Sequence, residues 1–212
     1  MSLDVIQLSV EPIGTNCYLV RRPGAAEAVV VDPGGEAPRI LSELEDLGAR
    51  CVAILITHGH WDHLGGVADL AESTKAPVHM ARAERALLER LDTISPPELG
   101  LSSYTPDVLL EGSETLDLAG VAFEVLSVPG HSPGHLAYAA DGCLFSGDLL
   151  FASGVGRVDL PGGDWDTLLQ SIAALLSRFP PDTAVYSGHG PPTTLGREAA
   201  ENPFLTELRT LR

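Results

Sequence analysis

The strongest restriction on the fold and function of this chain comes from one short segment, THGHWDH at positions 57–63. It places four imidazole and carboxylate side chains within six residues, directly after the apolar run from Val52 to Ile56. An apolar run that ends in a glycine-interrupted loop is typical of a buried strand followed by an irregular turn. Open α/β sheets bind their ligands where strands end at the carboxyl edge. The segment therefore predicts a functional site at the end of a buried strand.

Three further loops repeat this arrangement, because each follows an apolar, strand-like run and carries histidine or aspartate beside glycine. They are PGHSPGH at 129–135, SGD at 146–148 and SGHG at 187–190, so that six of the seven histidines lie in loops of this kind. Neutral imidazole and carboxylate suit zinc, manganese or iron, and a catalytic zinc site typically has three protein ligands and an open position. The candidate ligands are His58, His60, Asp62, His63, His131, Asp148 and His189.

Seven ligands are too many for one tetrahedral ion, so the sequence predicts two metal ions. We expect His58, His60 and His131 to bind the first ion, Asp62, His63 and His189 to bind the second, and Asp148 to bridge both. Two cations roughly 3.5 to 4 Å apart can hold a shared hydroxide, polarise a carbonyl oxygen and neutralise a leaving anion. The predicted activity is hydrolysis.

Two polar residues near these loops are expected to support the site rather than to bind metal. His135 follows His131 by four residues and has no vacancy left among the ligands, which favours a supporting role or a substrate contact. Asp32 ends an early strand before Pro33, where a turn residue is the ordinary interpretation. Our hypothesis is that the Asp32 carboxylate instead orients one of the metal-binding imidazoles.

The apolar pattern divides the chain into two halves with the same order, namely β hairpins, a strand, a loop bearing His or Asp, and then a helix. The expected strands are 5–10, 17–21, 28–31, 52–56, 77–80, 115–118, 121–125, 136–140, 144–145 and 183–186, and the expected helices are 38–47, 64–71, 81–91 and 164–179. Residues 93–106 break the pattern and form either a plain connector or a mobile rim over a site. Two such halves face to face predict a sandwich of two sheets with helices outside, and 212 residues suit one domain over 1–212.

Composition limits the partners of this chain. The formal charge is −16, and only 13 Lys and Arg residues are present, whereas nucleic-acid binding depends on phosphate neutralisation by such residues. No apolar run approaches the 18 or so residues needed to span a bilayer, and the start Met1–Asp4 lacks the features of a signal peptide. The three cysteines have apolar neighbours and fit buried thiols in a reducing compartment. We therefore expect a cytoplasmic protein with neither a nucleic-acid nor a membrane partner. The sequence does not indicate an oligomeric state.

The metal-binding motifs also carry a resemblance to a known family. THGHWDH at 57–63, PGHSPGH at 129–135, SGDLLF at 146–151 and SGHG at 187–190 resemble the motifs of the metallo-β-lactamase superfamily, in the branch of glyoxalase II and its short bacterial relatives. The similarity spans nearly the whole chain and includes the tail at 198–205. The resemblance implies an α/β fold, the four-layer αββα sandwich, with a binuclear site at one edge of the two sheets.

The resemblance also implies an activity and its cofactors. It implies two divalent ions, zinc in the first place with iron or manganese as alternatives, and hydrolysis of a small-molecule acyl thioester such as S-lactoylglutathione by a metal-bridging hydroxide. Asp62 and Asp148 would be the catalytic carboxylates. The bridging position of Asp148 and the lack of a signal peptide argue against a β-lactamase, and the acidic composition argues against the RNA-processing nucleases of the family.

The chain departs from the long glyoxalase II pattern at its end, because it stops at Arg212 with little room for the helical region that supplies glutathione contacts. Arg157 and the connector at 93–106 are then the candidates for substrate contact, and a salt bridge that braces its own loop is an equal interpretation of Arg157. Two alternatives to a hydrolase remain open. One is a mononuclear iron persulfide dioxygenase of the same superfamily, and the other is a metal-bearing scaffold without turnover.

Overall fold

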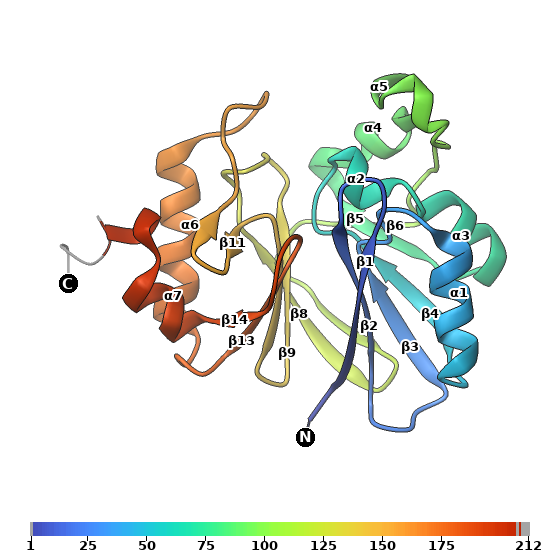
Figure 1. Cartoon of the computed structure of the whole chain (residues 1–212), viewed down its shortest axis with the longest axis horizontal. Coiled ribbons are helices and arrows are strands. Elements are labelled where there is room, and N and C mark those ends of the chain that lie inside the picture. Colours follow the sequence, from blue (N-terminus) through green and yellow to red (C-terminus); the bar gives the residue numbers. More distant parts are fainter. Residues whose placement is uncertain (1, 207, 209–212) are drawn as a thin grey trace.

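Two β-sheets that face each other form the centre of the molecule (Figure 1). The computed structural model describes residues 2–206 and residue 208. The first sheet has the order β1 (Asp4–Val10), β2 (Thr15–Arg21), β3 (Glu27–Val31), β4 (Arg50–Leu55), β5 (Val78–Ala81) and β6 (Val108–Leu110). Its first three strands are antiparallel neighbours, and β3 to β6 run parallel to one another.

The second sheet is built from the other half of the chain. Its order is β14 (Thr193–Thr194), β13 (Ala184–Ser187), β10 (Cys143–Gly147), β9 (Leu136–Ala140), β8 (Val121–Ser127) and β7 (Thr115–Leu118). The strands β10 and β13 are parallel, so the loops that follow them leave the sheet at the same edge. Beyond that edge a short hairpin forms from β11 (Leu150–Phe151) and β12 (Gly154–Val155).

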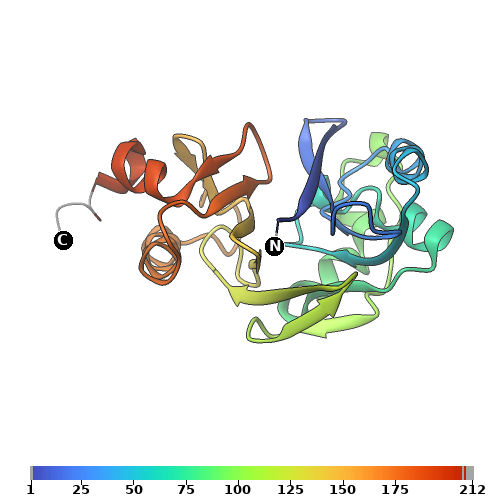
Figure 2. The same cartoon turned by 90° about the horizontal axis from the view of Figure 1, so that it is seen from below.

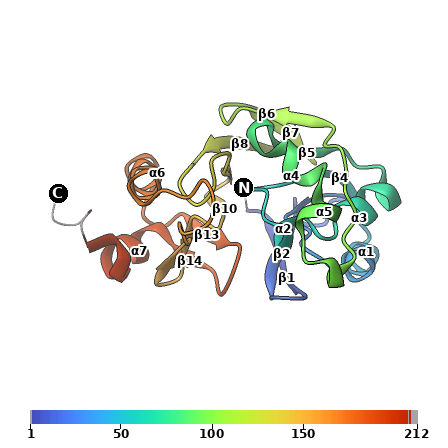
Figure 3. The same cartoon turned by 90° about the horizontal axis from the view of Figure 1, so that it is seen from above.

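Helices cover the outer faces of both sheets, so that the molecule has four layers (Figures 1 and 2). On the first sheet lie α1 (Ala37–Asp46) and α3 (Val67–Thr74), and on the second lie α6 (Trp165–Arg178) and α7 (Leu195–Glu201). Shorter elements follow the upper edge of the first sheet (Figure 3). They are α2 (Trp61–Leu64), α4 (Arg85–Leu88), α5 (Leu91–Ile94) and 3-10 turns at Arg82–Glu84 and Pro97–Leu99, and a further 3-10 turn at Pro203–Leu205 follows α7.

The period of two along each strand distributes the side chains between three apolar layers. In β3, Val29 and Val31 point into the core between the sheets, while Ala28 and Val30 belong to the core under α1 and α3. Because both faces of such strands are buried, their sequences read as continuous apolar runs rather than as alternating ones. A third core lies between the second sheet and α6 with α7.

The longest helix, α6, begins and ends where its sequence indicates. Asp164 accepts a hydrogen bond from the Thr167 amide at 2.8 Å and caps α6, whose buried side includes Leu168, Ile172 and Leu175. The helix stops before Pro180, which cannot continue it. None of the helices in the described part of the chain has the length and apolar character needed to cross a membrane.

The predicted αββα sandwich is confirmed, and the differences are local. The helix predicted at 64–71 is wrong in its bounds, because α2 begins at Trp61 and the pair Gly65–Gly66 separates it from α3. The single helix predicted over 81–91 is wrong as well, since this stretch is broken into a 3-10 turn and the short helices α4 and α5. Good helix formers were present, but the segment packs as short turns over the edge of the sheet.

Candidate metal centre

The four loops singled out in the sequence meet at one edge of the two sheets. His58 and His60 follow β4, and Asp62 and His63 lie on α2 directly behind them. From the second half of the chain, His131 lies between β8 and β9, Asp148 follows β10, and His189 follows β13. Figure 3 views the molecule from the side of this edge. All seven candidate ligands are thereby brought together.

Three imidazoles form the first group, and their nitrogens converge. His131 Nε2 lies 2.8 Å from His60 Nδ1 and 3.2 Å from His58 Nε2, and the last two atoms are 3.1 Å apart. Burial first, and then the neighbouring His131, lower the pKa of His60 to about 4. Burial, followed by the nearby His63, also holds the pKa of His58 well below its usual value. At neutral pH both rings are therefore uncharged and able to act as ligands.

The hydrogen-bond partners assign the protons of this group. His131 Nδ1 lies 2.7 Å from the carbonyl oxygen of Arg157, which can only accept, so Nδ1 carries the proton and Nε2 carries a lone pair. His58 Nδ1 lies 3.0 Å from the Thr57 hydroxyl, and this hydroxyl donates to Asp32 Oδ2 at 2.6 Å. The hydroxyl thus accepts from His58 Nδ1, which leaves the lone pair on His58 Nε2. Two lone pairs face each other 3.2 Å apart, an arrangement that fits a cation between them.

The second group combines imidazole and carboxylate. His63 Nδ1 lies 2.9 Å from Asp32 Oδ2, which places the proton on that nitrogen, while His63 Nε2 lies 3.3 Å from both Asp62 Oδ2 and Asp148 Oδ1. His189 Nε2 lies 3.3 Å from Asp62 Oδ2. Hydrogen bonds with Asp148 and then Asp62 raise the pKa of His189 to about 9.

Asp148 lies between the two groups. Its Oδ2 is 3.5 Å from His189 Nε2 and 3.7 Å from His131 Nε2. Burial raises the pKa of Asp148, but the neighbouring His63 and the hydrogen bond with His189 outweigh burial and hold this pKa well below its usual value. The carboxylate is therefore charged and faces ligands of both groups.

These residues fit a pair of metal ions. The sets whose ligand atoms lie within 4.8 Å of one another are His58 with His60 and His131, His58 with His63 and Asp148, and Asp62 with His63 and His189. Two buried ligand atoms, His63 Nε2 and Asp148 Oδ1, have no hydrogen-bond partner among the described residues. A buried polar atom without a partner is costly, and coordination to a cation would satisfy both.

Asp32 supports both groups from below. It is 2% exposed, its Oδ2 contacts His63 Nδ1 and the Thr57 hydroxyl, and its Oδ1 accepts from the Thr57 amide at 2.8 Å. A carboxylate that holds the outer ring nitrogen of a ligand fixes both the tautomer and the orientation of the ring. Through Thr57, the same carboxylate also reaches His58.

His135 lies behind the first group rather than in front of it. Its ring is fully buried, with its centroid 4.8 Å from that of His58 and 5.6 Å from that of His131. Neither ring nitrogen has a hydrogen-bond partner among the described residues, and burial lowers the pKa of the ring well below its usual value. His135 is not among the residues that line the open side of the site.

Sequence reasoning missed Glu84, which joins two of the metal-binding loops. Its side chain is buried, with 2% of the residue exposed. One carboxylate oxygen accepts a hydrogen bond from the Gly134 amide at 2.8 Å, and the other accepts from the Gly59 amide. The loop of His58 and the loop of His131 are thus held by one acidic residue. A lone glutamate in a segment with helical composition carried no signal for this role.

The stretch Thr15-Asn16-Cys17-Tyr18 of β2 was also missed, and it ties the first sheet to the loop of His189. The Thr15 hydroxyl donates to Asp62 Oδ2 at 2.9 Å. Asn16 donates through Nδ2 to the carbonyl oxygens of Ser187 at 2.9 Å and Gly190 at 2.8 Å. Thr15 and Asn16 lie just before the strand predicted at 17–21, and the partners of Asn16 lie up to 174 residues away.

Tyr18 provides a measurable test of this tie. Its buried hydroxyl donates to the Ser187 carbonyl oxygen at 2.6 Å, and Asn16 Nδ2 donates to the same oxygen. Tyr18→Phe is expected to lower the free energy of unfolding by about 1 kcal/mol, because one hydrogen bond is lost while the carbonyl keeps another donor. Tyr186→Phe is the matched control, since this ring stacks in the same cluster and its hydroxyl has no hydrogen-bond partner within the described residues. Equal unfolding midpoints for the two variants in urea would contradict the expectation.

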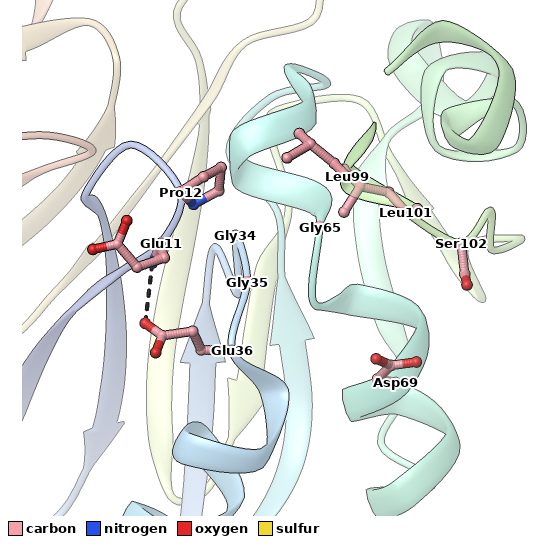
Figure 4. A pocket seen from close by; sticks show the side chains of 11 residues that line it. Glu11, Pro12, Gly34, Gly35, Glu36, Gly65, Asp69, Leu99, Leu101 and Ser102 are labelled. Atoms are coloured by element: carbon pink, nitrogen blue, oxygen red, sulfur yellow. Dashed lines mark hydrogen bonds between the residues drawn. The ribbon is translucent and has the colours of Figure 1, made fainter. Parts of the chain in front are cut away.

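The turn that carries Asp32 approaches the metal-binding helix α2 too closely for side chains. A Cβ on Gly34 would lie 1.8 Å from the Asp62 carbonyl oxygen, and one on Gly65 would lie 2.4 Å from the Gly34 carbonyl oxygen. Both glycines line a cavity of about 320 Å³ beside the turn (Figure 4). Its charged side chains are Glu11, Glu36 and Asp69. No candidate ligand lines this cavity, so it is separate from the metal centre.

A larger cavity, of about 830 Å³, opens over the metal centre, and the candidate ligands that line it are His60, Asp62, His131, Asp148 and His189. Arg157 lines the same cavity and also forms a salt bridge within its own loop. The guanidinium donates from Nε to Asp159 Oδ1 at 2.7 Å and from its terminal nitrogen to Oδ2 at 2.6 Å. This pairing lowers the pKa of Asp159 to about 2. Arg157 therefore lies at the cavity and also forms a salt bridge within its own loop, so its position agrees with both interpretations.

Comparison with known proteins identifies the class to which this fold and this cluster belong. The sequence profile of the metallo-beta-lactamase superfamily matches residues 10–189. The chain belongs to the metallo-beta-lactamase superfamily. The resemblance noted from the four motifs is thereby confirmed.

Individual relatives cover almost the whole chain. The hydroxyacylglutathione hydrolase GloC of Haemophilus influenzae is 33% identical, over 97% of this chain and 98% of that protein. The crystal structure of BLEG-1, a B3 metallo-beta-lactamase, is 38% identical with a TM-score of 0.89, over 96% of this chain and all of that one. The structure of TTHA1623 in a di-iron-bound form is 42% identical with a TM-score of 0.83, over 95% of this chain and all of that one. These names differ, so membership of the superfamily does not name the substrate.

Proposed function

We propose that this chain is a metal-dependent hydrolase with a binuclear centre that cleaves acyl thioesters of the S-lactoylglutathione type. The observation that carries the proposal is three overlapping sets of imidazole and carboxylate ligand atoms, each set within 4.8 Å of one another, at the floor of an open cavity. We assign His58, His60 and His131 to one ion, Asp62, His63 and His189 to the other, and Asp148 to both. Bound there, two divalent cations, zinc in the first place and iron or manganese as alternatives, would act as Lewis acids and lower the pKa of water.

The residues of the chain have distinct tasks in this proposal. The Arg157 carbonyl oxygen and the Asp32 carboxylate keep protons on the outer nitrogens of His131 and His63, so that the inner nitrogens stay available. The carboxylates of Asp62 and Asp148 offset cationic charge at the floor of the cavity and are the proposed catalytic carboxylates.

The relative GloC supports the thioester as the bond that is cleaved, because its name gives it a hydroxyacylglutathione substrate. A small molecule as the partner, and neither nucleic acid nor membrane, agrees with the formal charge of −16. The three cysteines are unpaired, as a reducing cytoplasm would leave them. We propose the cytoplasm as the location on this ground.

The test combines metal analysis with thioester hydrolysis on one preparation. We expect about two metal ions per chain, and thiol release from S-lactoylglutathione or another acyl thioester that disappears after chelation and returns when metal is added back. Elemental analysis measures the metals, and a thiol reagent follows the reaction. Iron is included in the metal analysis because one relative has been crystallised in a di-iron-bound form.

Other outcomes would replace the proposal by a different one. One iron per chain with rapid oxygen consumption on glutathione persulfide would identify a dioxygenase. Cleavage of a β-lactam with no thioester turnover would follow the name of BLEG-1 instead. Two bound metals without turnover of any thioester, lactone or phosphoester would leave a metal-binding scaffold.

A further inference from the structure

The walls of the cavity over the metal centre are apolar, whereas its floor is formed by the candidate ligands. Large apolar side chains from four separate segments surround the opening. They include Ile13, Trp61, Leu87, Ile94, Phe151 and Leu160. Ligand sites of this size commonly combine apolar walls with a few polar groups that fix orientation. A ligand bound at the metal centre would therefore extend along this wall.

Two of these wall residues expose large apolar side chains to solvent. Ile13 is 55% exposed and Ile94 is 43% exposed, and with Phe204 they are the strongly exposed large apolar residues in the described part of the chain. Exposed apolar area is unfavourable in water, and its concentration around one cavity marks a binding surface. An apolar group in the cavity would cover both side chains.

The charges around the cavity disfavour an anionic ligand beyond the metal centre. Arg157 is the one arginine or lysine among the described residues that line it. Its guanidinium makes two hydrogen bonds to the Asp159 carboxylate, so a neighbouring anion offsets this one cationic charge. A glutathione group carries two carboxylates and one ammonium, and the wall offers these charges no free cationic partner.

We infer that the substrate group bound by this wall is apolar and uncharged, so that the chain prefers thioesters bearing such a group to S-lactoylglutathione. The inference rests on the proposed thioester hydrolysis. The apolar group can come from the acyl half or from the thiol half of the thioester, because both extend from the same carbonyl carbon. Water attacks that carbon, the carbon–sulfur bond breaks, and the products are a carboxylic acid and a thiol.

A set of four thioesters shows whether the apolar group comes from the acyl half or from the thiol half. Lactoyl and pentanoyl groups are each joined to glutathione and to benzyl mercaptan, and kcat/KM is measured for the four. Each buried methylene is worth roughly fourfold in kcat/KM, so the preferred apolar half is expected to raise kcat/KM at least about tenfold. The acyl half is the source if pentanoyl carries the gain, and the thiol half is the source if benzyl mercaptan carries it. S-lactoylglutathione as the best of the four would overturn the inference.

A binding measurement separates failure of this inference from failure of the proposed function. Benzyl methyl sulfide and S-methylglutathione are not cleaved by hydrolysis, and their binding is followed by intrinsic fluorescence, to which Trp61 in the wall contributes. If no thioester is cleaved, the proposed function fails, and tighter binding of benzyl methyl sulfide still supports the apolar site. Tighter binding of S-methylglutathione, with no gain from a pentanoyl group in the thioester assay, overturns the inference.

A variant of the wall tests the same inference. Ile94→Lys places a cation in the apolar wall. The ratio of kcat/KM for the glutathione thioester to kcat/KM for the benzyl mercaptan thioester is expected to rise at least about tenfold. Phe204→Lys is the matched control, since this side chain is 49% exposed and lies outside the cavity. Ile13→Lys, at 55% exposure, replaces Ile94→Lys if that variant does not fold. An unchanged ratio in a folded wall variant, or the same shift in Phe204→Lys, would contradict the inference.

Discussion

Asp148→Ala is expected to abolish hydrolysis and to lower the metal content in the same preparation. The carboxylate lies 3.3 Å from His63 Nε2, 3.5 Å from His189 Nε2 and 3.7 Å from His131 Nε2, so its removal takes one ligand from each proposed ion. Loss of the second ion removes several kcal/mol of transition-state stabilisation, which corresponds to a fall in kcat of at least about 1000-fold. Elemental analysis and a thioester assay on the same sample measure both effects.

The control for Asp148→Ala is an aspartate far from the metal centre. Asp117→Ala changes an exposed position on β7 and is expected to keep the full metal content and kcat. One outcome for Asp148→Ala would contradict the bridging assignment. A variant that retained two metals and full turnover would show that the carboxylate binds neither ion.

The position of the metal centre could be predicted because its geometry follows from local rules. His58 and His60 come after β4, a parallel strand, and Asp148 and His189 come after β10 and β13, which are parallel to each other. Each of these residues lies in a polar loop that follows an apolar run in the sequence. Parallel neighbouring strands end at a common edge of their sheet. Local strand signals therefore indicated which residues meet, although they lie far apart in the sequence.

The residues that hold the loops in place could not be predicted in this way. Glu84 binds the amides of Gly59 and Gly134, which are 25 and 50 residues away, and Asn16 binds carbonyl groups 171 and 174 residues away. Such contacts depend on how the halves of the chain pack and follow no period in the sequence. The same reason explains the segment at 81–91, where helix propensity was overridden by packing at the edge of the sheet.

Glu84→Ala is expected to weaken metal binding at the first group of histidines. Its carboxylate accepts hydrogen bonds from the amides of Gly59 and Gly134, and these loops carry His58, His60 and His131. Loss of a partner that orients metal ligands typically costs 10-fold to 100-fold in affinity, so we expect about that loss at the first ion. The free energy of unfolding should fall by about 2 to 3 kcal/mol, because buried amides lose a charged acceptor. Competition with a chelator measures the two metal affinities separately.

The separate affinities distinguish a positioning role from a general loss of stability. Glu84 makes no hydrogen bond or salt bridge to His63 or His189 among the described residues, so the second ion should keep most of its affinity in a folded variant. Glu84→Gln keeps one carbonyl acceptor but turns an amide toward the other donor, and an intermediate affinity at the first ion is expected. Glu89→Ala is the matched control on the same segment, since Glu89 forms a salt bridge with Arg85 at the surface. Equal loss at both ions, or a folded Glu84→Ala with unchanged affinity at the first, would refute the role of Glu84 in holding the two loops.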